Sequence, residues 1–279
     1  MLKFLKSGFY TTLQDFGRFG YRDIGVPVSG VMDELSVKKA NILLENKNED
    51  AVLEITMTGP TLIFELPTYI CLSGAKLSPT LNNEPIENYK VIKVEAGDIL
   101  SYGKLESGFR SYLAVKGGFQ GENRLGSYSQ YNPVTVKKCF KDGDEITYAQ
   151  IKHYEPVISE LKLESHLNND TIEVFRGPEF SLLTDAQLAA LFSKDFTISK
   201  KNNRMAYQLE QEIESHSYSM LTSGTLPGTV QLTPAGRLII LMKDGQTTGG
   251  YPRVLQLSEA SISTLAQKKF GDTISFKLC

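Results

Sequence analysis

The 279-residue sequence lacks tryptophan altogether and has only three cysteines and three histidines. Cys71, Cys139 and Cys279 are far apart and form no C-x-x-C pair. An odd, dispersed set of cysteines favours reduced thiols over a disulfide framework or a zinc site. His153 and His166 do not have the spacing of a metal-ligand pair or a catalytic base, so we expect them at the surface, with no metal site.

The sequence also lacks a long apolar segment and a strong charge of either sign. Its longest aliphatic run is about five residues, far short of the roughly 20 that a membrane helix needs. The first six residues contain no apolar stretch of signal-peptide length. The net charge is −2, which gives no basic field for nucleic acid or an anionic membrane. We expect a soluble cytoplasmic protein that binds neither.

Several catalytic signatures are missing as well. There is no G-x-x-x-x-G-K-[ST] loop, no G-x-S-x-G elbow and no H-E-x-x-H helix. A nucleotide, if one binds, is therefore not held by a P-loop.

The richest stretch is residues 244–253, which follow a predicted buried strand at 238–242. Gly249 and Gly250 permit positive φ and close backbone approach. Polar groups are concentrated in the same turn: Asp244, Gln246, Thr247, Thr248 and Tyr251. The turn is either a ligand-binding loop or a well-hydrogen-bonded turn that binds nothing.

The rest of the chain predicts a mainly β fold with a few helices. Short strands between residues 51 and 150 have the spacing of a β-sandwich or barrel. Three Gly-Asp turns, at 97–98, 143–144 and 271–272, each precede an alternating strand. Helices are predicted at 33–46 with Asp33 as N-cap, from the Thr184–Gln187 capping box to Leu191, and at 259–268.

Loss of periodicity between 151 and 170 predicts a connector between two domains. The expected organisation is residues 1–150, the connector 151–170, and residues 171–279.

Four further polar residues, outside this turn, are candidates for chemistry: Asp15, Arg18, Glu54 and Arg204. Arginine can bind a carboxylate through two hydrogen bonds, and carboxylates beside it can polarise a small carboxylated or amide substrate. Glu54 interrupts an apolar strand. It either faces solvent or is buried with a cation or hydrogen-bond partner.

Several motifs together resemble the 5-oxoprolinase C-subunit family, also called KipA, in the biotin-dependent carboxyltransferase superfamily with allophanate hydrolase subunit 2. They occur in order at 12–18, 25–33, 53–62, 177–178, 203–205, 227–231 and 246–252. The sequence departs from the family at Tyr128, where an arginine is usual, and at Ala206, where glycine is usual. The missing arginine puts an anion contact at Tyr128 in doubt.

The resemblance implies two cyclophilin-like β-barrel domains and a cytoplasmic bacterial protein that works in a complex. With the KipI-like B subunit of 5-oxoprolinase, and possibly its A subunit, it would open 5-oxoproline to L-glutamate at the expense of ATP, whose site is unknown. By this reading Arg18 or Arg204 holds a substrate carboxylate, and Glu54 or Asp244 orients water or takes a proton. Asp15, Gln246, Thr247, Thr248, Gly249, Gly250 and Tyr251 would bind the substrate.

Two other functions remain open, because a fold does not fix a function. One is a carboxyltransferase that uses carboxybiotin from another chain to carboxylate urea or a similar amide. The other is a regulatory protein that sequesters a KipI-like kinase inhibitor.

Overall fold

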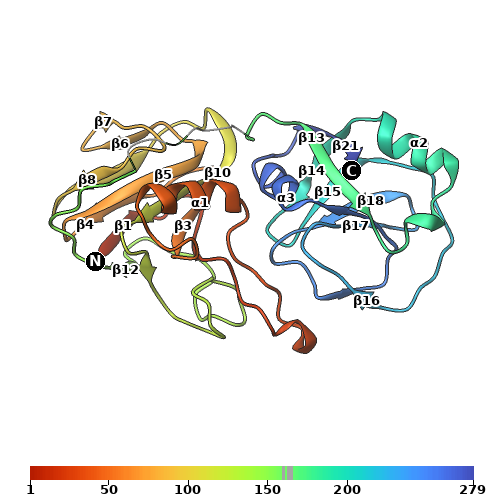
Figure 1. Ribbon diagram of the computed structural model, residues 1–279, viewed down its shortest axis with the longest axis horizontal. Coiled ribbons are helices and arrows are strands. Elements are labelled where there is room, and N and C mark those ends of the chain that lie inside the picture. The colour runs from red at the N-terminus through yellow and green to blue at the C-terminus, as the bar shows by residue number, and fades with distance from the viewer. Residues whose placement is uncertain (159–160, 162–165) are drawn as a thin grey trace. The chain divides into compact units, whose positions relative to one another are not determined.

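The computed structural model describes residues 1–158, 161 and 166–279, and these form two compact units (Figure 1). The first comprises Met1–Arg18 and Ser29–Leu167, and the second comprises Phe19–Val28 and Asn168–Cys279. The predicted mainly β fold is confirmed, with three α-helices in the described ranges. Within those ranges no helix combines the length and apolarity needed to cross a membrane.

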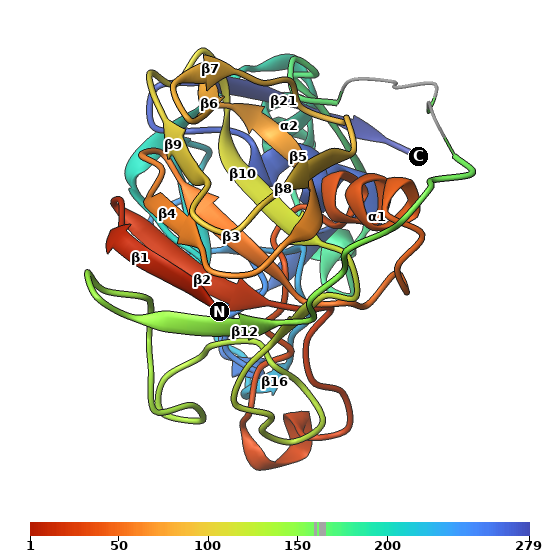
Figure 2. The ribbon, with the colours of Figure 1, turned by 90° about the vertical axis from the view of Figure 1, so that its left-hand side faces the viewer.

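Two sheets build the first unit (Figure 2). The seven-stranded sheet has the order β11 (Phe119–Gln120), β12 (Glu145–Tyr148), β1 (Leu2–Lys6), β4 (Thr61–Phe64), β9 (Ile99–Tyr102), β6 (Pro79–Leu81) and β7 (Glu84–Pro85). The five-stranded sheet has the order β2 (Tyr10–Gln14), β3 (Val52–Thr56), β10 (Ser107–Val115), β5 (Thr68–Lys76) and β8 (Ile92–Val94). A short 3-10 helix, η1 (Arg22–Ile24), belongs to the second unit.

Helix α1 (Glu34–Leu43) lies against β5 and β10. Its apolar face buries Val37, Ala40 and Leu43, which pack with Tyr112 and Ala114 of β10. The predicted N-cap is confirmed, because the Asp33 side chain accepts from the Ser36 backbone N–H. The helix ends three residues earlier than 46, where Glu45 has a positive φ of 49°.

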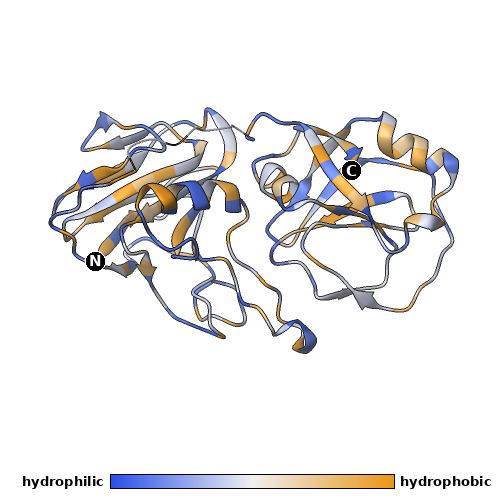
Figure 3. Ribbon diagram, viewed as in Figure 1, coloured by the Kyte–Doolittle hydropathy of each residue, from blue (hydrophilic) through white to orange (hydrophobic). Residues whose placement is uncertain are grey.

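The second unit is a closed barrel. Its strand order is β13 (Thr171–Arg176), β20 (Arg253–Leu257), β17 (Thr229–Leu232), β18 (Arg237–Leu241), β15 (Ala206–Glu212), β14 (Phe196–Asn202) and β21 (Thr273–Leu278). The pairs are antiparallel except β13 with β21. Hydrophobic residues line the strands of both units (Figure 3).

Besides η1, this unit contains the helices η2 (Phe180–Leu182), α2 (Asp185–Ser193) and α3 (Glu259–Ala266). It also contains a small ribbon of β16 (Ser223–Gly224) paired with β19 (Thr248–Gly249). The predicted capping box of Thr184 and Gln187 is confirmed at α2. The three Gly-Asp turns lead into β9, β12 and β21, as predicted. The connector at 151–170 stays a prediction, since residues 159–160 and 162–165 lie outside the described residues.

Candidate functional site

Asp15 follows β2, and its carboxylate accepts four hydrogen bonds from residues of its own unit. Ser127 Oγ and Ser129 Oγ each donate to Oδ1 over 2.6 Å, and the Tyr128 backbone N–H donates to Oδ2 over 2.7 Å. The Gly17 N–H donates to Oδ1 over 2.8 Å. Asp15 is only 7% exposed, so the carboxylate fixes residues 127–129 in place beside β2. Its predicted contact with substrate stays a prediction.

Arg18 also contacts the segment around residues 127–129, through backbone carbonyls. Its guanidinium donates to the carbonyls of Ser129 and Arg124, and the side chain is 1% exposed. Asp15 and Arg18 therefore act together on the loop that carries Tyr128, the position where the family usually has arginine. Tyr128 also lines a small cavity of 280 Å³, together with Leu13 and Phe140.

Glu54 is buried, which decides between the two alternatives left open by the sequence. Its Oε2 accepts from the Met32 backbone N–H at 2.8 Å and from the Tyr112 hydroxyl at 3.1 Å. Arg110 supplies the opposite charge, with Nε 3.8 Å from Oε1. Burial raises the pKa of Tyr112 well above its usual value and the Glu54 carboxylate raises it further, so this hydroxyl stays protonated and donates.

The Tyr112 hydroxyl also accepts from the Asp33 backbone N–H at 2.9 Å, which extends these bonds toward His166. His166 Nε2 lies 2.8 Å from Asp33 Oδ2, and its side chain is only 11% exposed. The prediction that His166 lies at the surface is wrong. Because the ring comes from a position far along the sequence, no spacing rule could pair it with a helix-capping aspartate.

Arg204 and Asp244 form a buried two-pronged ion pair in the second unit. Arg204 Nε lies 2.9 Å from Oδ2 and Nη2 lies 3.0 Å from Oδ1, with side chains 7% and 13% exposed. The Asp244 backbone N–H donates to the Arg204 carbonyl at 2.9 Å. The turn between β14 and β15 is thus tied to the segment after β18, and the two parallel hydrogen bonds fix the plane of the guanidinium.

The predicted loop 244–253 is held along its length. Thr225 Oγ1 donates to the Gln246 carbonyl, and the Thr225 N–H donates to the Thr247 carbonyl at 3.0 Å. Gln246 Nε2 donates to Gln231 Oε1 at 3.3 Å. These bonds and the pairing of β16 with β19 give the loop a fixed conformation.

Gly249 is required for close approach and not for positive φ. Neither Gly249 nor Gly250 has a left-handed φ, so that part of the sequence interpretation is wrong. A Cβ on Gly249 would lie 2.4 Å from Gln231 Nε2, whereas one on Gly250 would meet nothing within 4 Å. Gln231 is 1% exposed, and its Nε2 has no hydrogen-bond partner among the described residues.

The loop also presents side chains outward. Thr248, Gly250 and Tyr251 are exposed, the last at 41%, while Thr247 is half-buried. The structure therefore brings Arg204, Asp244 and residues 246–251 into one unit, and Asp15, Arg18 and Glu54 into the other. Their roles toward a substrate stay predictions.

Sequence reasoning missed the partners that hold these side chains. They are Arg110, Tyr112, Ser127, Ser129, Gln231 and His166. Gln231 lies inside the motif at 227–231 and Ser127 directly precedes the departure at Tyr128, so these motifs were a usable signal. Arg110 and Tyr112 lie in β10, outside the family motifs, and no sequence signal marked them.

Comparison with known proteins matches residues 24–278 to the family described as carboxyltransferase domain, subdomain A and B. The chain is 34% identical to the C subunit of 5-oxoprolinase from Escherichia coli, over all of this chain and 91% of that protein. It is 32% identical to the C subunit of 5-oxoprolinase from Haemophilus influenzae, over 95% of this chain and 87% of that protein.

The structure of Kluyveromyces lactis urea carboxylase is similar as well. It superposes with a TM-score of 0.83 and 30% identity, and the match covers 99% of this chain but 27% of that much longer chain.

Proposed function

Because the chain belongs to the carboxyltransferase domain A and B family, and within it to the 5-oxoprolinase C-subunit proteins, we propose that it is the C subunit of an ATP-dependent 5-oxoprolinase. The complex would open 5-oxoproline to L-glutamate in the cytoplasm. The observation that carries the proposal is the identity of 34% along nearly the whole length of both proteins.

The reaction needs ATP because a lactam is a stable amide. Phosphoryl transfer to the lactam oxygen breaks the bond between the γ-phosphorus and ADP and makes the ring carbon electrophilic. Water then adds to that carbon, and the ring C–N bond breaks to leave a free amine and an acyl phosphate. A second water hydrolyses the acyl phosphate to glutamate and phosphate. The sum is 5-oxoproline, ATP and two waters going to glutamate, ADP and phosphate.

The arginines are proposed to hold the substrate carboxylate. Arg204 is the stronger candidate of the two, since Asp244 fixes the plane of its guanidinium at the start of the loop 244–253. Arg18 donates to two loop carbonyls and would act mainly by positioning Tyr128.

The carboxylates are proposed to differ in role. Asp244 is engaged by Arg204 through both oxygens, so its proposed role is to orient the arginine. Glu54 is buried among Met32, Tyr112 and Arg110, and we propose that it orders the end of β3 and the start of α1. The exposed Thr248 and Tyr251 would contact the substrate directly.

The partners in this proposal are the KipI-like B subunit and possibly the A subunit of 5-oxoprolinase, with ATP bound at a place in the complex that this chain alone does not specify. The experiment is to measure 5-oxoproline-dependent ATP hydrolysis by the chain alone and together with those partners. Turnover that requires the mixture supports the proposal.

The likeness to urea carboxylase favours one alternative, a carboxyltransferase acting on urea or a similar amide with carboxybiotin from another chain as the second substrate. This alternative predicts carboxyl transfer to urea when carboxybiotin is supplied. Absence of that transfer, together with turnover of 5-oxoproline, would exclude it. A complex with the KipI-like protein that shows no turnover would instead favour a regulatory role.

A further inference from the structure

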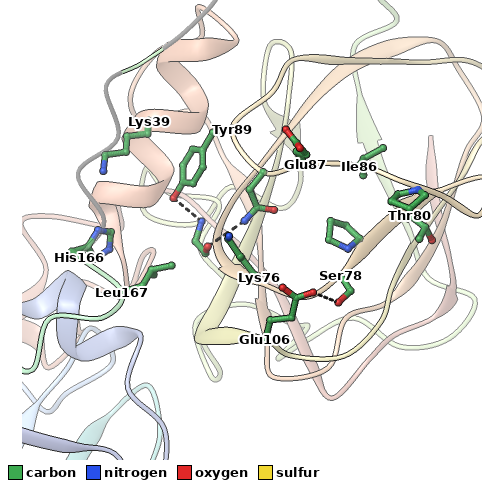
Figure 4. A pocket seen from close by; sticks show the side chains of 14 residues that line it. Lys39, Lys76, Ser78, Thr80, Ile86, Glu87, Tyr89, Glu106, His166 and Leu167 are labelled. Atoms are coloured by element: carbon green, nitrogen blue, oxygen red, sulfur yellow. Dashed lines mark hydrogen bonds between the residues drawn. The ribbon is translucent and has the colours of Figure 1, made fainter.

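The first unit contains a cavity of 660 Å³ that includes none of the residues assigned above to 5-oxoproline (Figure 4). Its walls come from α1, β5, the β6–β7 hairpin, the loop after that hairpin, and residues 166–167. Small-molecule sites usually occupy about 300–1,000 Å³. The cavity is therefore large enough to hold a ligand.

One side of the cavity carries the cationic side chain of Lys39 beside an imidazole. Lys39 and His166 lie together there, and Lys76 lies between them and the opposite wall (Figure 4). His166 Nε2 lies 2.8 Å from Asp33 Oδ2, which leaves Nδ1 for other contacts. Asp33 is fully buried and is itself held by Ser36, with Oγ 2.6 Å from Oδ2. The imidazole is therefore rigidly placed.

The opposite side is acidic. Glu87 and Glu106 lie there, away from Lys39 and His166 (Figure 4). Ser78 Oγ donates to Glu106 Oε1 over 2.6 Å, which orients this carboxylate at the cavity wall. A cationic and an acidic side that face one cavity match a ligand carrying both a carboxylate and an ammonium group.

Apolar residues also line the cavity: Pro79 of β6, Pro85 of β7, Ile86 after that strand, and Leu167. Ile86 lies beyond Glu87 and Glu106, and Leu167 lies beside His166 (Figure 4). A polar side chain on the ligand would lose water against these residues without gaining a hydrogen bond.

We propose that this cavity binds a free amino acid with an apolar side chain. Its carboxylate lies toward Lys39, Lys76 and His166, its ammonium group lies toward Glu106 and Glu87, and its side chain packs on Pro79, Pro85 and Ile86. The proposal is independent of the 5-oxoprolinase activity, because binding is measured on the purified chain without ATP or partner proteins.

The first test is calorimetric titration of the whole chain with L-leucine, and with two analogues that each lack one charged group, 4-methylpentanoate and 3-methylbutylamine. L-Leucine is expected to bind at least about tenfold more tightly than either analogue, as for the loss of a charge-assisted hydrogen bond. Equal binding of 4-methylpentanoate, tighter binding of L-glutamate, or no binding of L-leucine would each overturn the proposal.

Two matched pairs of variants place the ligand in this cavity. Lys39→Met is expected to weaken L-leucine binding about tenfold or more, whereas Lys38→Met on the same helix, whose lysine pairs with Glu34, leaves it unchanged. Glu106→Gln is expected to weaken it similarly, and Glu84→Gln in exposed β7 is its control. Circular dichroism confirms that each variant is folded. Unchanged affinity in both folded cavity variants would contradict the assignment.

Discussion

Arg204 and Asp244 face each other through two parallel hydrogen bonds of 2.9 and 3.0 Å, and both side chains are almost completely buried. Removing one partner of a buried pair leaves the other charge uncompensated, which costs more than the pair itself contributes. We therefore expect the same ion pair to stabilise the barrel and to fix the conformation of the loop at 244–253.

Asp244→Asn is expected to lower the free energy of unfolding by about 2 kcal/mol and to lower 5-oxoproline-dependent turnover of the complex at least about a hundredfold. The amide keeps one acceptor for Arg204 but removes the charge. Urea denaturation and the coupled ATPase assay measure the two effects. Asp195→Asn, an exposed residue of the same unit, is the control and should change neither. Wild-type turnover in folded Asp244→Asn would remove this residue from the site.

Glu54 and Arg110 form a second buried pair, at 3.8 Å. Glu54→Gln and Arg110→Met are each expected to destabilise the chain by about 3 kcal/mol, because each leaves an unpaired buried charge. The double variant should be more stable than the sum of the single effects by about 1 kcal/mol or more. Chemical denaturation of all four proteins gives this coupling, and strict additivity would show that the two charges do not interact.

Gly249 and Gly250 provide a comparison within one loop. Gly249→Ala places a methyl group against the Gln231 amide and is expected to cost about 1–3 kcal/mol, since that buried side chain has to move. Gly250→Ala should stay within about 0.5 kcal/mol of the wild type. Thermal denaturation measures both. If the contact is the cause, adding Gln231→Ala to Gly249→Ala restores part of the loss; no restoration would point to another cause.

The ion pair of Glu179 with Arg253 predicts a pH dependence. Hydrogen bonds from Arg253 lower the pKa of the Glu179 carboxyl below its ordinary value of 4.5. A carboxyl with a depressed folded pKa contributes stability that is fully present above the unfolded pKa and is lost as the pH falls through the folded pKa.

We therefore expect Glu179→Gln to destabilise the chain by about 1 kcal/mol at pH 7, with the difference from wild type shrinking below pH ~4.5. Urea denaturation at pH 7 and pH 3 measures it. Glu173→Gln, which breaks an exposed 3.8 Å pair with Lys277, is the control and should have little effect at either pH. A difference that grows toward pH 3 would contradict the assignment.

Local signals in the sequence were sufficient for two helix N-caps and for the Gly-Asp turns. Asp33, Thr184 and Gln187 cap helices because capping depends on neighbours within one turn, and the Gly-Asp turns precede strands for the same reason. The contacts of Glu54 with Tyr112 and of His166 with Asp33 could not be predicted. Each joins residues that are far apart in the sequence and that only the fold brings together. Burial of Glu54 itself was one of two open alternatives, since an apolar strand accommodates a charge when a cation from another strand is near.

The motif-based family assignment succeeded where single residues did not. Gly177 shows why: a Cβ there would lie 2.1 Å from the Arg253 carbonyl oxygen, so the motif residue is required by packing between segments far apart in sequence. A residue that packing requires in this way helps to identify the family, but it gives no information about which residues contact the substrate. The assignments of Arg18, Glu54, Arg204 and Asp244 toward substrate therefore stay predictions to be tested by experiment.

The most direct test is 5-oxoproline-dependent release of phosphate from ATP, measured for the purified chain, for the KipI-like B subunit together with the A subunit, and for the complete mixture. We expect turnover only in the mixture, with glutamate and phosphate formed in equal amounts. Turnover without this chain, or a stable complete complex that releases no phosphate in response to 5-oxoproline, would contradict it.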